Sequence, residues 1–283
     1  MSVVYLNGET LPLEQARISV LDRGFTFGDG VYEVLPVISG SIFRIEEHLI
    51  RLENSLSSIY IDNPHTFEEW TEIFNGVIER NQCRDGCSIY VQVTRGAGER
   101  DHIYDEGIKP TVFVMCRKVA NRDVSGGITA VTHEDIRWKY CSIKSTALLA
   151  NVLLRKRAFD TDGSREAILL RNGLLTEGAA SNVFVVSGGK IKTPAKNGNI
   201  LPGITRDLVV ELLQATPYGC METAITEDEL RKADEIWVTS STIGIVPVVV
   251  LDGIEVGNGI PGGVWKEANK IYLTFINSQH SNV

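Results

Sequence analysis

A lysine that interrupts an otherwise apolar strand-to-helix junction constrains this chain more than any other feature. Lys144 follows Ile143 and precedes the apolar run Ala147-Leu148-Leu149, so its amine can be desolvated. Desolvation lowers the pKa of a lysine, and the neutral amine is a nucleophile. Taken alone, a lysine beside a hydrophobic helix is more often a surface residue whose stem lies along apolar neighbours.

A carboxylate and a helix start follow Lys144 and narrow this interpretation. Glu177 stands in Leu-Thr-Glu-Gly, and residues 201–206, Leu-Pro-Gly-Ile-Thr-Arg, open an amphipathic stretch. Each is common alone, because Thr-Glu-Gly is typical of a turn and Pro-Gly of a helix start. An amine, a carboxylate and the free N–H groups of a helix N-terminus, in this order, together suit pyridoxal 5'-phosphate.

Each of these parts has a chemical role toward that cofactor. Lys144 forms the Schiff base with the cofactor aldehyde. Glu177 keeps the pyridine nitrogen protonated, so that the ring accepts the electrons of a substrate carbanion. The backbone N–H groups of Gly203, Ile204 and Thr205, together with the Thr205 hydroxyl, bind the phosphate.

Two N-terminal segments complete a family resemblance. They are Asp22-Arg-Gly-Phe-Thr-Phe-Gly-Asp-Gly-Val-Tyr32 and His48-Leu-Ile-Arg51. With Lys144 and Glu177, they resemble the fold-type IV pyridoxal-phosphate enzymes, which include branched-chain aminotransferases, D-amino acid aminotransferases and aminodeoxychorismate lyases. The resemblance covers nearly all 283 residues. From the residues alone, Arg51 among leucines also suits a surface position on an amphipathic helix.

The resemblance implies further cofactor residues. It assigns Arg51 to the cofactor phosphate, Leu201 to the ring face, and Ser241 and Thr242 to the phosphate edge. One position departs from the family pattern, because relatives usually have an acidic residue where Gly244 stands.

A charged segment bears on the substrate. Residues 93–102, Val-Thr-Arg-Gly-Ala-Gly-Glu-Arg-Asp-His, resemble the loop by which D-amino acid aminotransferases hold the substrate α-carboxylate. Arg100 would bind that carboxylate in a bidentate manner, with His102 and the Tyr32 phenol as further donors. The alternative is a solvated loop in which Arg100 pairs with Glu99 or Asp101, and Glu99 could also weaken the carboxylate site.

The resemblance implies a homodimer as well. In the relatives, the arginine and the histidine of this loop reach the pocket from the neighbouring subunit. We therefore expect the active site at the subunit interface.

Patterning predicts an α+β (α/β) chain of two domains. A smaller N-terminal α/β domain, 1–118, is joined by the polar linker 119–127 to a cofactor-binding domain, 128–283. The resemblance adds a mixed, barrel-like sheet in the second domain. Because the carboxylate loop lies in the first domain and most cofactor residues in the second, we expect the active site between them. Local predictions are a hairpin turning at Asn7-Gly8, helices over 46–58, 67–81 and 264–277, and a capping box over 226–229.

Composition excludes several classes of protein. The net charge of -8 without a basic stripe argues against nucleic acid as a partner. No apolar run is long enough to span a bilayer, and no signal-type segment opens the chain, so we expect a cytoplasmic protein away from the membrane. An odd number of cysteines without metal-site spacing predicts reduced thiols and no metal, with Cys83 and Cys87 on a turn into a strand. The five are Cys83, Cys87, Cys116, Cys141 and Cys220.

These observations predict a transaminase that moves amino groups between D-amino acids, such as D-alanine, and 2-oxo acids, such as 2-oxoglutarate, in a ping-pong cycle. Lys144 would also shuttle the proton at the substrate α-carbon. An aminodeoxychorismate lyase, which releases pyruvate and 4-aminobenzoate, would keep Lys144, Glu177 and Arg51 and stays open. A branched-chain L-amino acid aminotransferase is disfavoured by the Arg100-x-His102 pair. A binding protein that has lost the cofactor is disfavoured by Lys144.

Overall fold

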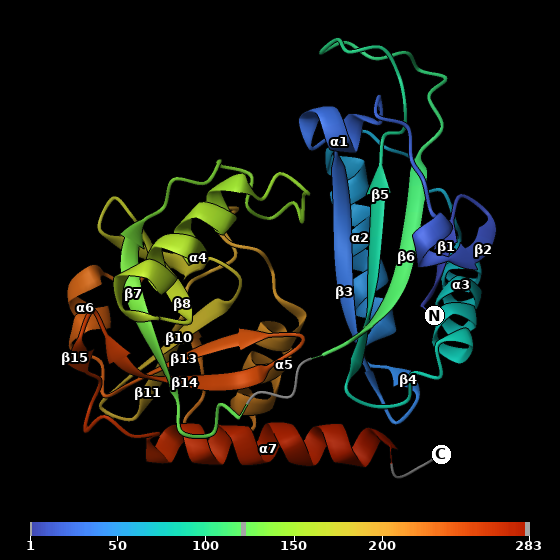
Figure 1. Ribbon diagram of the computed structural model, residues 1–283. Helices are drawn as coiled ribbons and strands as arrows, with labels where there is room; N and C mark the ends of the chain where they lie inside the picture. The colour runs from blue at the N-terminus through green and yellow to red at the C-terminus, as the bar shows by residue number, and fades with distance from the viewer. Residues whose placement is uncertain (1, 120–122, 281–283) are drawn as a thin grey trace. The chain divides into compact units, whose positions relative to one another are not determined.

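The computed structural model describes residues 2–119 and 123–280 (Figure 1). Contacts divide the chain into two units, Met1–Asn121 with Ile143–Leu148, and Arg122–Ser142 with Leu149–Val283. The boundary falls within the predicted linker 119–127, of which residues 120–122 lie outside the described residues. Unlike the contiguous division predicted from the sequence, the structure groups the segment containing Lys144 with the first unit, since it lies beside a strand of that unit.

Six antiparallel strands form the sheet of the first unit, in the order β2-β1-β6-β5-β3-β4 (Figure 1). They are β1 (Val3–Leu6), β2 (Glu9–Pro12), β3 (Gly30–Ile38), β4 (Ser41–Ile42), β5 (Cys87–Thr94) and β6 (Thr111–Lys118). The helices of this unit are the 3-10 helix η1 (Leu13–Gln15), α1 (Arg23–Phe27), α2 (Ile45–Ser58) and α3 (Phe67–Arg80).

The alternating pattern of β3 explains how α2 attaches to this sheet. Val31 and Leu35 are fully buried, with Glu33 between them on the same face. The apolar side of α2, with Leu52 and Leu56, packs in the same core. Glu33 therefore faces a helix rather than water and must find partners there.

A mixed sheet of nine strands forms the second unit, in the order β12-β11-β10-β13-β14-β7-β8-β9, with β15 paired to β14 (Figure 1). Strand β7 runs parallel to β14 and β8, as expected for a mixed sheet. The strands are β7 (Ile128–Glu134), β8 (Glu166–Arg171), β9 (Leu174–Gly178), β10 (Asn182–Ser187), β11 (Lys190–Thr193), β12 (Met221–Glu222), β13 (Glu235–Ser240), β14 (Gly244–Leu251) and β15 (Ile254–Glu255). The helices are α4 (Leu149–Asp162), α5 (Ile204–Gln214), α6 (Glu227–Arg231) and α7 (Gly263–His280).

Strands β10 and β13 are buried on both faces. Val183 and Val238 belong to one core cluster, whereas Phe184 and Trp237 stack on the other face with ring centroids 6.0 Å apart. Asn182 lies opposite Thr239 in the same strand pair and continues the second face. Two polar residues thus stand at the end of an aromatic face.

Several local predictions are confirmed. The first hairpin turns at Asn7 and Gly8, both with positive φ, and Thr226 forms the predicted capping box with Glu229. The predicted helices differ from α2, α3 and α7 by at most three residues at either end. No helix among the described residues is long and apolar enough to cross a membrane.

The prediction of reduced thiols is wrong for Cys83 and Cys87, which form a disulfide. The predicted turn between them is present, with Gly86 at φ +64°, and it brings the two Cα atoms to 6.2 Å. That separation lies within the range that a disulfide spans. The error has two causes: the odd cysteine count favoured reduced thiols, and the spacing of Cys83 and Cys87 indicated only a turn. Cys116, Cys141 and Cys220 are free thiols.

Candidate active site

Lys144 lies in an irregular segment held against β3 in the first unit. The Tyr32 N–H donates to the Lys144 carbonyl at 2.9 Å, and the Lys144 N–H donates to Ser55 Oγ on α2 at 3.2 Å. The Lys144 amine lies 4.3 Å from the centroid of the Tyr32 ring. Hydrogen bonds to β3 and α2 therefore fix the backbone of Lys144, and its amine lies over the face of the Tyr32 ring.

Tyr32 itself belongs to an aromatic pair that sequence reasoning missed. Its ring stacks on Tyr90 of β5, with centroids 5.7 Å apart. Burial raises the pKa of Tyr90 to about 12, and its hydroxyl donates to Gln92 Oε1 at 2.6 Å. Tyr90 and Gln92 alternate along a predicted strand, which could have placed them on one face, but the pairing with Tyr32 required the register of β3 with β5.

Arg51 is buried in an ion-pair cluster with Glu33 and His48. Its Nε and Nη2 donate to Glu33 Oε1 and Oε2 at 2.6 and 2.9 Å, and His48 Nδ1 lies 2.8 Å from Oε2. Burial opposes the charge of Glu33, but Arg51 and His48 hold the pKa of its carboxyl well below the usual range. Burial lowers the pKa of His48. The nearby Glu33 carboxylate opposes this change by raising the pKa, but the effect of burial is larger.

The surface alternative for Arg51 is therefore wrong, since the residue is only 6% exposed. Its assignment to the cofactor phosphate stays a prediction. The described contacts show a guanidinium bound to Glu33 and fixed in orientation by two parallel hydrogen bonds.

Glu177 is buried in the second unit and is surrounded by donors. Arg137 Nη1 forms an ion pair with Oε1. The Leu201 N–H and the Asn182 side-chain amide both donate to Oε2 at 3.0 Å. A positive charge and two hydrogen bonds thus favour the carboxylate form of Glu177 in a fixed position.

Arg137 is the residue of this site that sequence reasoning missed. Its side chain is 7% exposed and also binds Asp135, with Nε 2.9 Å from Oδ1. Although burial opposes its charge, Asp135 and Glu177 raise the pKa of Arg137. An Asp-x-Arg spacing was the available signal, but it stands in a charged segment and the partner Glu177 lies 40 residues further along the chain.

The sequence predicts a phosphate site at the start of α5. Gly203 caps the helix without a side-chain hydrogen bond, so the first N–H groups of the helix are not capped by a side chain. A Cβ atom at Gly203 would collide with Asn182 Oδ1. Opposite Asn182, the buried Thr239 hydroxyl has no partner among the described residues. An orphaned hydroxyl beside uncapped N–H groups suits a phosphate, so these residues fit the cofactor.

Tyr272 of α7 contacts two parts of the predicted phosphate site. One is Thr205, and the other is the end of the turn that contains Ser241 and Thr242. Burial raises the pKa of Tyr272 to about 12, and its hydroxyl is hydrogen-bonded to the Thr205 side chain. At the end of that turn Gly244 has φ +67°, and a Cβ there would lie 3.0 Å from the Tyr272 ring. This close approach gives a physical reason for glycine where relatives usually carry an acidic residue.

The loop with Arg100 and His102 gathers on Phe27 of α1. The Arg100 guanidinium carbon lies 5.3 Å from the Phe27 centroid, and the His102 ring lies 5.6 Å away. Within the described part of the chain, Arg100 forms no ion pair with Glu99 or Asp101. Both side chains are exposed, and their binding to a substrate carboxylate stays a prediction.

A buried arginine anchors this loop. Arg23 donates from Nη1 to the Asp101 carbonyl at 2.6 Å and is fixed by Asp29 at 2.9 Å. Arg95 also binds Asp29 and lies 3.8 Å from the Tyr104 centroid. Arg23 stood in a quoted motif, but its role was missed because its loop partner lies 78 residues away.

The fold and the site are those of a fold-type IV aminotransferase. The features are a mixed sheet, a lysine amine on a tyrosine ring, and a buried carboxylate next to a helix N-terminus. Residues 30–251 match the family described as amino-transferase class IV, and the chain belongs to this family.

Curated relatives and solved structures agree with this family. The chain is 38% identical over 265 residues to a D-alanine aminotransferase of Bacillus licheniformis, covering 93% of each chain. It is 36% identical over 284 residues to that of Staphylococcus haemolyticus, covering 99% and 100%. Its fold matches the Escherichia coli branched-chain amino acid aminotransferase with a TM-score of 0.90 at 25% identity, covering 96% and 94%. It also matches the branched-chain enzyme of T.th. with pyridoxamine 5'-phosphate, with a TM-score of 0.89 at 27% identity, covering 96% and 93%.

Proposed function

We propose that this aminotransferase exchanges amino groups between D-amino acids, such as D-alanine, and 2-oxo acids, such as 2-oxoglutarate, with pyridoxal 5'-phosphate as its cofactor. The observation that carries the choice of substrate is the anchored loop in which Arg100 and His102 converge on Phe27. Whole-length relatives named D-alanine aminotransferases support it at 36–38% identity. The branched-chain enzymes cited above are less similar in sequence, at 25–27%.

Lys144 holds the cofactor and moves the α-proton of the substrate. When bound, the cofactor supplies an electron sink for the carbanion at the substrate α-carbon. The amine of Lys144 accepts this proton and returns one during the opposite half of the cycle. The Tyr32 ring beneath it limits the directions in which the amine reaches the substrate, and thereby selects one substrate face.

The remaining cofactor residues orient the cofactor ring and bind its phosphate. Glu177, which is paired with Arg137, would hold the proton on the ring nitrogen of the cofactor. Leu201, whose N–H binds Glu177, would contact the ring. The phosphate would be held by the start of α5, by Arg51, and by the hydroxyls of Thr205, Thr239, Ser241 and Thr242.

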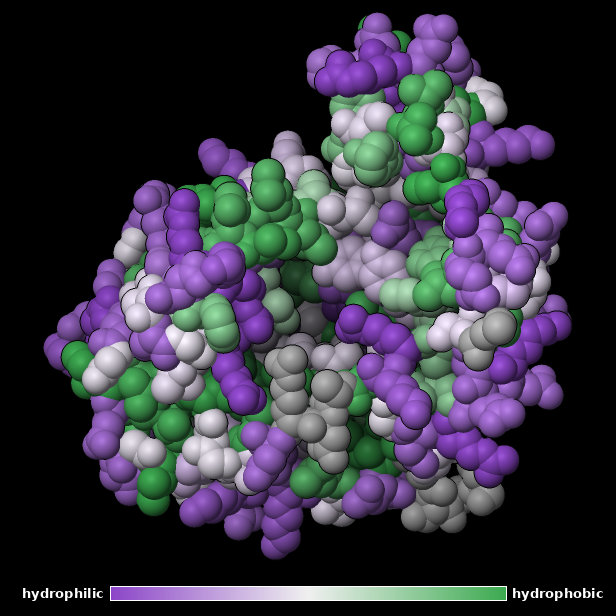
Figure 2. Space-filling view, in the orientation of Figure 1, coloured by the Kyte–Doolittle hydropathy of each residue, from purple (hydrophilic) through white to green (hydrophobic). Residues whose placement is uncertain are grey.

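The substrate carboxylate is bound by Arg100, His102 and Tyr32, with the loop contributed by a second copy of the chain. Exposed apolar side chains surround the base and tip of the loop: Val20 is 73%, Phe25 72% and Ile103 84% exposed. Figure 2 shows hydrophobic surface near α1, whose position is labelled in Figure 1. Such a surface favours burial against a partner, so we propose a homodimer.

Substrate conversion tests this proposal directly. The purified holoenzyme is given D-alanine and 2-oxoglutarate, and pyruvate is followed with lactate dehydrogenase. We expect sustained pyruvate formation with D-alanine, and bleaching of the cofactor absorbance by D-alanine but not by L-leucine. Bleaching by L-leucine alone would favour the branched-chain alternative. Release of 4-aminobenzoate from aminodeoxychorismate, with no reaction of D-alanine, would favour the lyase.

A further inference from the structure

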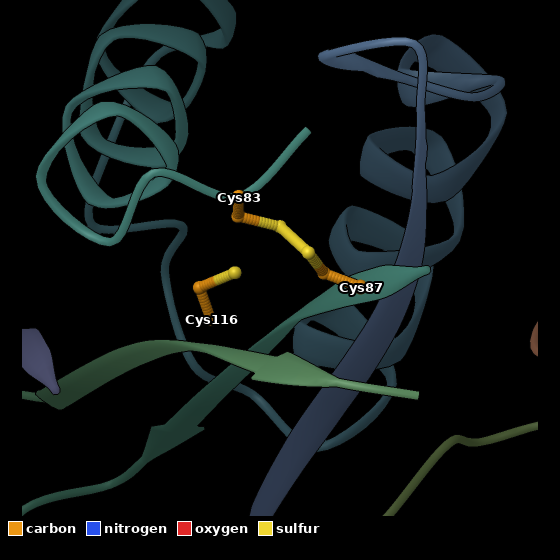
Figure 3. Close-up of side chains that lie close together, drawn as sticks. All are labelled: Cys83, Cys87 and Cys116. Atoms are coloured by element: carbon orange, nitrogen blue, oxygen red, sulfur yellow. A yellow bond between two sulfur atoms is a disulfide. The ribbon is translucent and has the colours of Figure 1, made fainter. Parts of the chain in front are cut away.

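Three cysteines from separate segments gather in the first unit. Cys83 follows α3, Cys87 begins β5 and Cys116 lies on β6. Their sulfur atoms all lie within 4.8 Å of one another. Figure 3 shows the Cys83–Cys87 disulfide with the Cys116 sulfur directed toward it. We call these three residues the cysteine cluster.

The fold holds the cluster in place. Ile89 pairs with Cys116 and Cys87 with Lys118 in the β5–β6 register, so Cys87 and Cys116 are diagonal neighbours on one face. Cys83 and Cys87 are 5% and 6% exposed, and Cys116 packs against the same hydrophobic core. Three sulfur donors are therefore prearranged in a setting that excludes most water.

The cluster is distant from the proposed substrate loop. Cys87 begins β5, whereas Arg95 follows the last residue of that strand. A strand of this length separates its ends by roughly 23 Å, at about 3.3 Å per residue. The catalytic proposal does not use these sulfurs.

All three side chains in the cysteine cluster offer sulfur as the donor atom, and this decides which metal ions the cluster binds. Thiolates are soft ligands that select ions such as Zn²⁺, Cd²⁺ and Cu⁺. At a metal–sulfur distance of about 2.3 Å, ligands around one ion lie roughly 4 Å apart, which the cluster allows. We propose that Cys83, Cys87 and Cys116, once the disulfide is reduced, bind one soft metal ion, and that reformation of the disulfide releases it.

The steps balance in atoms and electrons. Two small-molecule thiols reduce the Cys83–Cys87 bond, giving two protein thiols and one small-molecule disulfide. A divalent ion then displaces the protons of three thiols and is held by three thiolates. In the reverse direction, the Cys83 and Cys87 thiolates pass two electrons to a small-molecule disulfide, which is released as two thiolates that take up protons from water. The ion is left with only Cys116.

Cadmium titration of the holoenzyme tests the proposal. The reductant-treated protein, freed of reductant without air, is titrated with Cd²⁺ while thiolate-to-metal absorbance is recorded in the ultraviolet. We expect one ion per chain, at least ~10-fold weaker binding in Cys116→Ser because one of three ligands is lost, and no binding after treatment with oxidised glutathione. Cys220→Ser, which alters a buried thiol of the second unit, is the matched control and should bind as the wild type does.

A variant-free measurement guards against misfolding of Cys116→Ser. Reduced wild-type protein is alkylated with and without Cd²⁺, and each cysteine is quantified by mass spectrometry. The ion should protect Cys83, Cys87 and Cys116 while leaving Cys141 and Cys220 unchanged. Absence of this protection, or the same cadmium absorbance in Cys116→Ser and wild type, would overturn the metal site. D-Alanine turnover, measured in parallel, shows whether the holoenzyme is intact.

Discussion

Two buried arginine–carboxylate pairs, Arg51–Glu33 in the first unit and Arg137–Glu177 in the second, differ in what else contacts the carboxylate. Glu33 is additionally bound by His48, and both of its side-chain donors lie on α2, so the pair fastens a helix to β3. Glu177 is additionally bound by the Leu201 N–H and the Asn182 amide, both next to the start of α5. Both carboxylates are at most 4% exposed.

The comparison teaches that burial and pairing alone do not identify a catalytic carboxylate. In the first pair the partners belong to the helix that packs on the sheet, which indicates a structural role for Glu33. In the second they belong to the edge of a predicted ligand site, which indicates a chemical role for Glu177. Removing one partner of either pair should be costly, but the cost should appear in different measurements.

The largest expected effect removes the residue on which catalysis depends. Lys144→Ala eliminates the amine that holds the cofactor and moves the α-proton, so D-alanine turnover and the absorbance of the covalently held cofactor should both be lost. Unfolding by urea should change little. Lys139→Ala, an exposed lysine nearby in sequence, is the control. Normal turnover in Lys144→Ala would contradict the catalytic assignment of Lys144.

Glu33→Gln should chiefly lower stability. The neutral amide leaves the buried Arg51 guanidinium without its counter-ion, and we expect the free energy of unfolding to fall by about 3 kcal/mol. Urea denaturation measures this change. Glu47→Gln, on α2 and with a side chain that is 40% exposed in its pair with Arg44, should cost less than ~0.5 kcal/mol. Equal losses in the two variants would show that the Glu33 pair does not fasten α2.

Glu177→Gln should chiefly lower the rate. The amide cannot keep the ring nitrogen protonated, so we expect kcat to fall at least ~100-fold, or roughly 2.7 kcal/mol at the transition state. Steady-state kinetics with D-alanine measures this fall, and Glu227→Gln on the exposed side of α6 serves as control. A change within about twofold would reduce Glu177 to a structural residue like Glu33.

Arg100→Ala tests the substrate loop, which neither pair touches. Loss of a bidentate contact made by both substrate and transition state should lower kcat/KM for D-alanine by ~10-fold or more while cofactor binding is unchanged. Adding a His102 substitution should cost less than the sum of the two single changes, since both donors serve one carboxylate. Arg80→Ala, exposed at the end of α3, is the control. Unchanged D-alanine activity in Arg100→Ala would favour the lyase.

Local features of the fold could be predicted because their causes are local. The Asn7-Gly8 turn and the Thr226 capping box depend on residues at most three positions apart. The family and the fold class were predicted from short sequence motifs, and the family match and the solved structures confirm both. Lys144, Glu177 and the start of α5 were selected by their order along the chain, and their roles at the cofactor stay predictions.

The missed residues act over long sequence separations. Arg137 meets Glu177 and Arg23 meets the substrate loop only after the sheets have formed. The pairing of Cys83 with Cys87 was missed for another reason, because composition was taken to indicate a reducing compartment. Disulfides are more common in oxidising ones, so the cytoplasmic location stays a prediction.

The smallest expected effect separates the two pairs by pH, because only Glu33 has a histidine partner. Burial lowers the pKa of His48 in the folded chain below the ordinary histidine value of about 6.5, so near that pH the unfolded chain binds a proton that the folded chain does not. Stability should therefore fall as pH drops from 6.5 toward the folded pKa, by at most about 1.4 kcal/mol per pH unit. The pKa of Glu33 is lowered instead, and its contribution is lost only at more acidic pH, below 4.5. His48→Asn keeps a donor but cannot titrate, and should flatten urea-derived stability between pH 7.5 and 5.5. A slope unchanged in His48→Asn would mean that the pKa of this histidine is the same in the folded and the unfolded chain.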